Sequence, residues 1–94
     1  MSGADDILKE RLRVLDHEPY DAAHDDQHTD GQLAVVAAEL AVAHTEIQVR
    51  LDTPFGGVIS DMWGLRSRHH DTRRRLVIAG ALIAAEIDRL DRIR

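Results

Sequence analysis

The chain lacks cysteine and is poor in aromatic residues, with one Trp, one Tyr and one Phe among 94 residues. The absence of cysteine excludes disulfide bonds, zinc sites built on thiolates and a cysteine nucleophile. A metal ion would need histidine and carboxylate ligands instead. Because aromatic side chains supply much of a small core, we expect the core of a single copy to be thin.

A stretch of transmembrane length and a signal peptide are also absent. The first six residues, Met-Ser-Gly-Ala-Asp-Asp, have neither a basic flank nor an apolar run. We therefore expect a cytoplasmic protein that does not bind membranes. No nucleophile elbow surrounds Ser60 or Ser67, and the pair Gly56-Gly57 lacks the lysine of a phosphate-binding loop.

Negative charge is concentrated in the first third of the chain. Residues 1–30 hold nine acidic and three basic residues, a net charge of −6, whereas the whole chain carries −5. An acidic surface repels nucleic acid and suits a basic protein surface. The chain has one basic stretch, 66–75, which either binds phosphate groups or is a solvated linker and first helical turn. Trp63 is the one aromatic residue near it, which argues against a nucleic-acid partner.

Apolar residues at helical spacing predict three long helices. The first covers 4–16, and Ser2 and Asp5 at its start have the spacing of a capping box. The second covers 29–51 and begins at another capping box, Thr29-Asp30-Gly31-Gln32. A Pro-Phe-Gly-Gly sequence then ends it, because proline and paired glycines disfavour a helix.

The third helix begins after Asp71, a suitable N-cap, and is apolar on two sides. One row consists of Leu76, Gly80, Ile83, Ile87 and Leu90, and a second row of Ile78, Leu82 and Ala85. A helix that is apolar on two sides is buried on two sides, so it is either the central element or part of an oligomer interface. Gly80 permits the close approach of another helix.

These elements predict an all-α fold, a single domain over 1–94 built as an antiparallel bundle of three main helices. The stretch 58–65 allows a short fourth helix that places Met62 and Trp63 on the core. No sustained alternation of polar and apolar residues supports strands. The thin core and the doubly apolar third helix predict a homodimer.

Two imidazoles and two carboxylates lie within five residues just before the second helix: His24, Asp25, Asp26 and His28. Divalent metal ions accept such nitrogen and oxygen ligands. The same residue types are common in solvated loops, where carboxylates also complement the dipole of the helix that follows. The spacing matches no strict ligand motif, so both interpretations stay open.

A second candidate set consists of carboxylates on the second and third helices: Glu39, Glu86 and Asp88. Facing carboxylates hold Mg²⁺ in helical nucleotide pyrophosphohydrolases, which this chain resembles only loosely because Glu39 stands among alanines instead of in a paired-Glu motif. Exposed carboxylates paired with Arg89 and Arg92 explain the same pattern.

Two segments resemble a family of small uncharacterised proteins of phages and prophages. They are 20–34, with His24-Asp25-Asp26 followed by Asp30-Gly31-Gln32-Leu33-Ala34, and 73–92, with Ala85-Glu86-Ile87-Asp88-Arg89-Leu90-Asp91-Arg92. In that family the first motif follows a Gly-Trp pair, whereas this sequence has Pro19-Tyr20. The resemblance implies a mobile-element context and assigns no catalytic residue.

The interpretation favoured by size, charge and weak catalytic motifs is a non-enzymatic, phage-type interaction protein without a cofactor. It binds and inhibits or modulates a host protein in the host cytoplasm, such as a component of a defence system. We expect acidic side chains to form the contact: Asp16, Glu18, Asp21, Asp25 and Asp26. The alternative is a metal-dependent helical protein acting on nucleotides, with Mg²⁺ or another divalent ion held by the two ligand sets above.

Overall fold

The computed structural model confirms the all-α class. The structure describes residues 2–17, 22–45, 50–53, 56–58 and 63–93. In chain order the elements are α1 (Gly3–His17), α2 (Ala22–Asp26), α3 (Gln32–Val42), β1 (Arg50–Thr53), β2 (Gly56–Val58), α4 (Leu65–Arg68) and α5 (Thr72–Arg92).

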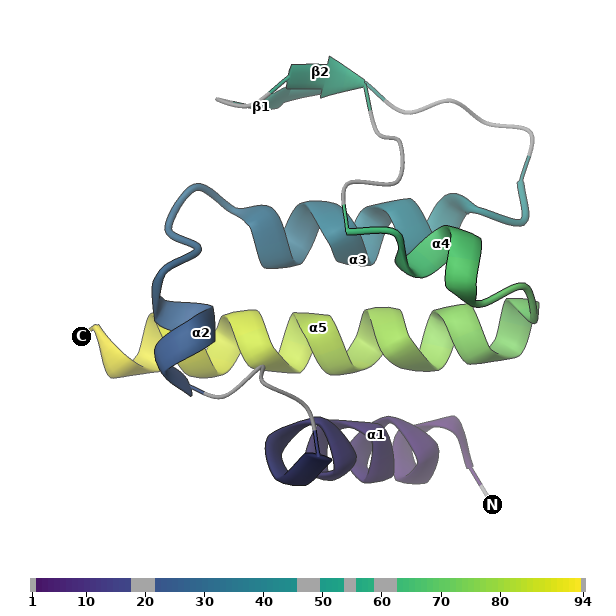
Figure 1. Cartoon of the computed structure of the whole chain (residues 1–94), viewed down its shortest axis with the longest axis horizontal. Helices are drawn as coiled ribbons and strands as arrows, with labels where there is room; N and C mark the ends of the chain where they lie inside the picture. The colour runs from purple at the N-terminus through teal and green to yellow at the C-terminus, as the bar shows by residue number, and fades with distance from the viewer. Residues whose placement is uncertain (1, 18–21, 46–49, 54–55, 59–62, 94) are drawn as a thin grey trace.

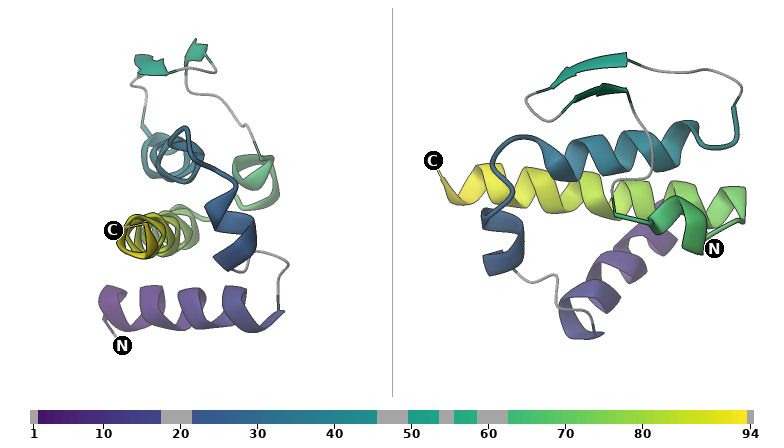
Figure 2. Two further views of the ribbon diagram at one scale, coloured as in Figure 1. Left: turned by 90° about the vertical axis from the view of Figure 1, so that its left-hand side faces the viewer. Right: turned by 45° about the horizontal axis from the view of Figure 1, so that its top comes forward.

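The long helix α5 is the central element, one of the two positions predicted for it. The helices α3 and α1 pack against it from opposite sides, and α2 also contacts it (Figure 1). The helix α3 runs antiparallel to α5, but α1 crosses α5 steeply, as Figure 2 shows where α5 is viewed end-on. The expectation of an antiparallel three-helix bundle is therefore not confirmed, because only one pair of long helices is aligned.

The crossing of α1 over α5 is close because position 80 is a glycine. A Cβ atom at Gly80 would lie 2.6 Å from Cδ1 and 2.8 Å from Cγ1 of Ile7 on α1. The predicted close approach at Gly80 is thus present, and the helix that approaches is α1.

Two of the three predicted helix starts are confirmed. The Ser2 hydroxyl accepts from the Asp5 amide at 3.1 Å, and the Asp71 carboxylate accepts from the Arg74 amide at 2.8 Å. The predicted capping box at the start of α3 is wrong, because the N-cap is Gly31 with φ of 86° and no side chain caps the helix there. A left-handed backbone suits glycine, which has no Cβ to clash.

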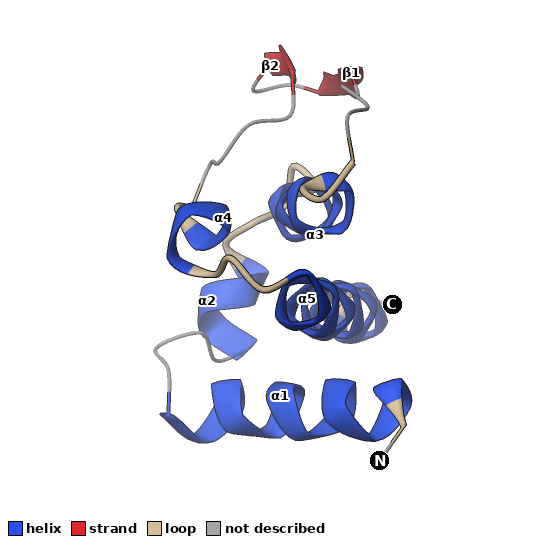
Figure 3. Ribbon diagram, turned by 90° about the vertical axis from the view of Figure 1, so that its right-hand side faces the viewer, coloured by secondary structure: helices blue, strands red, loops and turns tan. Residues whose placement is uncertain are grey.

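The second helix was predicted over 29–51, but the helix in the structure, α3, is shorter. It ends at Val42, where the Thr45 amide and hydroxyl both bond to the Val42 carbonyl, at 2.9 and 2.8 Å. The strands β1 and β2 follow it and pair antiparallel, on the side of α3 away from α1 (Figure 3). The expectation of no strands is wrong, because β1 and β2 are present. Residues 59–62 of the predicted fourth helix at 58–65 lie outside the described residues, and the short helix that the structure describes is α4, at Leu65–Arg68.

The core lies between α3, α4 and the second apolar row of α5. Its buried residues are Val36, Ala37, Leu40, Leu65, Ile78 and Ala79, with Trp63 and Leu82 packed against them. The first apolar row faces outward instead, since Leu76, Ile83, Ile87 and Leu90 are 42 % to 52 % exposed. Met62, which was expected beside Trp63, lies outside the described residues.

Candidate binding site

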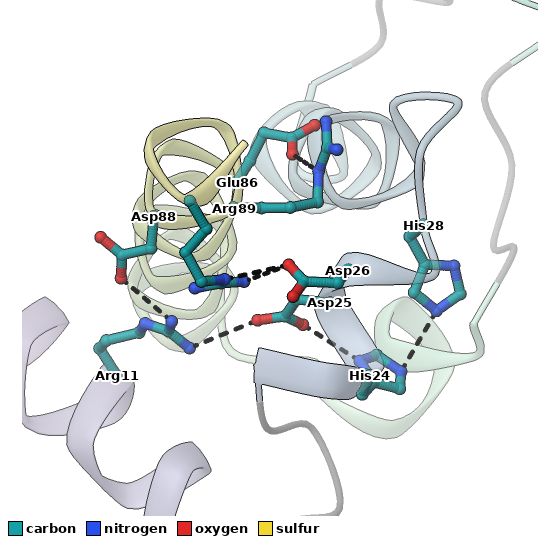
Figure 4. A network of polar contacts seen from close by, with 9 residues as sticks. Arg11, His24, Asp25, Asp26, His28, Glu86, Asp88 and Arg89 are labelled. Carbon is teal, nitrogen blue, oxygen red and sulfur yellow. Dashed lines mark hydrogen bonds and ion pairs between the residues drawn. The ribbon is translucent and has the colours of Figure 1, made fainter. Parts of the chain in front are cut away.

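The helix α2 lies between the first two predicted helices, and ion pairs fix it to α1 and α5. Asp25 is only 2 % exposed, and its Oδ2 lies 3.8 Å from Nη1 of Arg11 on α1 (Figure 4). Arg11 also donates to Asp88 of α5 at 3.1 Å, and Asp26 accepts from Arg92 at 2.7 Å. The two acidic residues of α2 thus join three helices.

A chain of imidazole contacts continues from Asp25. Its Oδ1 lies 3.1 Å from Nδ1 of His24, and Nε2 of His24 lies 3.3 Å from Nε2 of His28 (Figure 4). The Trp63 ring adjoins both, with centroids 5.7 Å from His24 and 5.0 Å from His28. Burial and the nearby His24 lower the pKa of His28, although Asp25 acts in the opposite direction, so His28 stays neutral near pH 7.

The four predicted metal ligands of this segment do not converge on one point. Asp25 faces Arg11 and Nδ1 of His24, and Asp26 is turned toward Arg92, so only the two Nε2 atoms face each other. Among the residues that the structure describes, no three histidine, aspartate or glutamate side chains are grouped to hold a metal ion. Metal binding here stays a prediction, and the ligand atoms that face each other in the structure are Nε2 of His24 and Nε2 of His28.

The second predicted set is likewise spread over separate contacts. Glu39 is buried on α3, Glu86 pairs with Arg89, and Asp88 pairs with Arg11. Pairing with arginine was the alternative interpretation of this set. It applies to Glu86, which pairs with the predicted Arg89, and to Asp88, whose partner is Arg11 of α1.

The predicted acidic contact surface is partly used inside the fold. Asp16 is exposed, but Asp25 is buried and Asp26 is paired with Arg92. Glu18 and Asp21 lie outside the described residues. Of the three described members of the set, Asp25 and Asp26 form ion pairs with Arg11 and Arg92, and Asp16 is exposed to solvent without either of these contacts.

A buried carboxylate that the sequence did not single out lies in the middle of α1, next to Arg11 in the sequence. Glu10 is 3 % exposed and binds Arg13 at 2.6 Å and Arg74 of α5 at 2.7 Å. Burial would raise the pKa of Glu10, but the hydrogen bonds and charges of Arg13 and Arg74 outweigh it and lower the pKa below 4.5. The pairing of Glu10 with Arg13 could be predicted from their i,i+3 spacing on one helix. The pairing with Arg74 could not, because no sequence pattern relates residues so far apart.

The predicted basic stretch is used largely within the fold. Arg73 binds Asp6, Arg74 binds Glu10, and Arg75 donates to the carbonyls of His69 and Arg66. These contacts join α5 to α1 and α4. They explain why arginines tolerate an unfavourable place at the start of a helix.

A cavity of about 440 Å³ lies between the Glu10 cluster and the α2 network. Its polar lining residues are Glu10, Arg11, Arg13, His24, Asp25, Arg68, His69 and Arg74. Its apolar wall is formed by Val14, Leu33, Trp63, Leu65, Ile78, Ala81, Leu82 and Ala85. The site therefore combines residues that are far apart in the sequence, which periodicity alone does not bring together.

Comparison with known proteins adds no relative: no family model, curated protein or solved structure matches the chain. The resemblance to phage proteins consequently rests on the two sequence segments alone. Of the helices in the described part of the chain, none is both long enough and apolar enough to cross a membrane.

Proposed function

We propose that this chain is a small homodimeric interaction protein that acts by binding a host protein. The observation that carries the proposal is the apolar surface of α1 and α5. Eight large aliphatic side chains are between 42 % and 67 % exposed, namely Leu8, Leu12, Leu15, Leu76, Ile83, Ile87, Leu90 and Ile93. Exposed apolar faces of this extent are typical of protein interaction sites.

The exposed row of α5 fits a second copy of the chain. Leu76, Ile83, Ile87 and Leu90 follow one another at intervals of seven, four and three residues, so they share one flank of the helix. In an antiparallel pair centred on Ile83, Leu76 of one copy lies opposite Leu90 of the other, since both are seven residues from the centre. The contact is then self-complementary, as a twofold axis requires.

The exposed face of α1 fits a different occupant, a host protein whose contact area is apolar with a basic rim. Leu8, Leu12 and Leu15 share one face of α1, and the exposed acidic residues Asp5 and Asp16 are on the same helix. Residues 1–30 have a net charge of −6. A basic rim on the partner would speed association through electrostatic steering, and salt would weaken it.

Site-specific photo-crosslinking in the host cell tests the α1 contact. A photoreactive amino acid at position 12 is expected to form an adduct with one host protein, identified by mass spectrometry. The purified host protein should then bind the chain directly, with an affinity lowered by Leu12→Lys and by salt. The same amino acid at position 93 is the matched control on an exposed aliphatic residue, the one that follows α5. Adducts of equal yield from both positions, or no direct binding, would contradict the proposal.

A further inference from the structure

The cavity between α1, α4 and α5 is distinct from the outer apolar faces of the proposed interfaces. We infer that it binds a small organic anion, a molecule with an apolar or aromatic body and one carboxylate or phosphate group. This inference does not depend on the proposed dimer or host contact.

The size and walls of the cavity suit the body of such a ligand. Its volume of about 440 Å³ lies in the range of about 300–1,000 Å³ found for small-molecule sites. The indole of Trp63 forms part of its wall. Ala81 and Ala85 of α5 also line the cavity, and their small side chains leave space for a ligand. An apolar ligand body there removes both its own surface and that of the wall from water.

The charge of the lining residues favours an anion. Four arginines line the cavity against two carboxylates. At the α4 end, Arg13, Arg68 and Arg74 come from three separate elements and share one lining carboxylate, Glu10. Because Glu10 already binds Arg13 and Arg74, the charge of Arg68 is left for a ligand at this end.

The protonation of His69 is consistent with an excess of positive charge. Burial lowers the pKa of His69, and the neighbouring charges of Arg74, Arg68 and Arg13 lower it further, against the opposite effect of Glu10. A bound anion would partly cancel the three guanidinium charges. It should therefore raise the pKa of His69, which an NMR titration of the imidazole reports separately from affinity.

The sole Trp of the chain makes binding directly measurable. Trp63 lines the cavity, so its fluorescence is expected to change on saturable binding of phenyl phosphate or benzoate. These two probes separate phosphate from carboxylate recognition. Benzyl alcohol has the ring without the charge, and inorganic phosphate has the charge without the ring. We expect each to bind at least about tenfold more weakly than the better aromatic anion, because a charge-assisted contact or the ring burial is lost.

Two arginines of α4 provide a matched pair of variants. Arg68 lines the cavity and Arg66 does not, and both are exposed, so neither change should disturb the core. Arg68→Gln is expected to weaken binding of the aromatic anion roughly tenfold, and Arg66→Gln to leave it unchanged. The inference would be overturned by equal affinities of the two variants, by benzyl alcohol binding as tightly as the anions, or by no saturable change with either anion.

Discussion

Gly80 of α5 and Ile7 of α1 touch where the two helices cross. An added Cβ at position 80 would stand within 2.6 to 3.2 Å of three side-chain atoms of Ile7. The absence of a side chain at Gly80 therefore sets how closely α1 approaches α5. The ion pairs that Glu10 and Arg11 form with α5 depend on that placement, and so does the direction in which the apolar face of α1 is exposed.

Gly80→Ala is expected to destabilise the protein by about 1 kcal/mol. The clash with Ile7 costs about 1–3 kcal/mol, and the better helix propensity of alanine returns up to about 1 kcal/mol. Urea unfolding followed by circular dichroism measures the difference. Gly3→Ala is the control, because a Cβ there meets nothing within 4 Å. A Gly80→Ala variant as stable as the Gly3→Ala variant would show that α1 approaches α5 differently.

Asp25→Ala is expected to lower the free energy of unfolding by about 3 kcal/mol, since it leaves a buried arginine with one partner fewer. Arg11 keeps Asp88, which places the effect at the lower end of the range for broken buried pairs. Asp26→Ala, in the next position, removes a partly exposed pair with Arg92 and should cost less than about 1 kcal/mol. Equal losses for the two variants would contradict the assigned burial of Asp25.

The stability of the protein should depend on the ionisation of Glu10. Its pKa in the folded chain lies below the ordinary value of 4.5, so the unfolded chain takes up the proton first. The contribution of Glu10 is therefore complete above pH 4.5 and is lost as the pH falls through the lower folded value. Urea midpoints of wild type and Glu10→Gln should differ most near neutral pH and approach each other in acid. A difference that stays constant with pH would count against this assignment.

Local signals in the sequence predicted the helix starts that depend on neighbouring residues. Ser2 with Asp5 and Asp71 with Arg74 make the expected bonds, because each partner lies three residues away. The end of α3 was not predictable in this way. Thr45 closes the last turn onto Val42, although the apolar spacing continues beyond it to 51.

The two apolar rows of α5 show a second limit of sequence periodicity. Both rows have helical spacing, and nothing in their composition decides which one faces α3. Ile78 and Leu82 pack into the core, whereas Ile83 and Ile87 are about half exposed. The choice depends on where α3 and α1 pack, which is a property of the tertiary structure.

The candidate site was predicted only where its residues are neighbours in the sequence. His24, Asp25 and His28 are in contact as their spacing allows. The pairing of Glu10 with Arg74 joins residues 64 positions apart, so no local pattern announces it. The cavity between these two clusters follows from that long-range pairing and was missed for the same reason.

Sedimentation velocity at micromolar concentration tests most directly whether the outward row of α5 joins two copies of the chain. Wild type should sediment as a dimer. Ile83→Lys places two like charges at the twofold axis and should weaken association at least about 30-fold, equivalent to about 2 kcal/mol. Ile93→Lys, a change at an exposed aliphatic residue outside the row, should remain dimeric. A monomeric wild type, or a folded Ile83→Lys variant that dimerises as wild type does, would contradict the account.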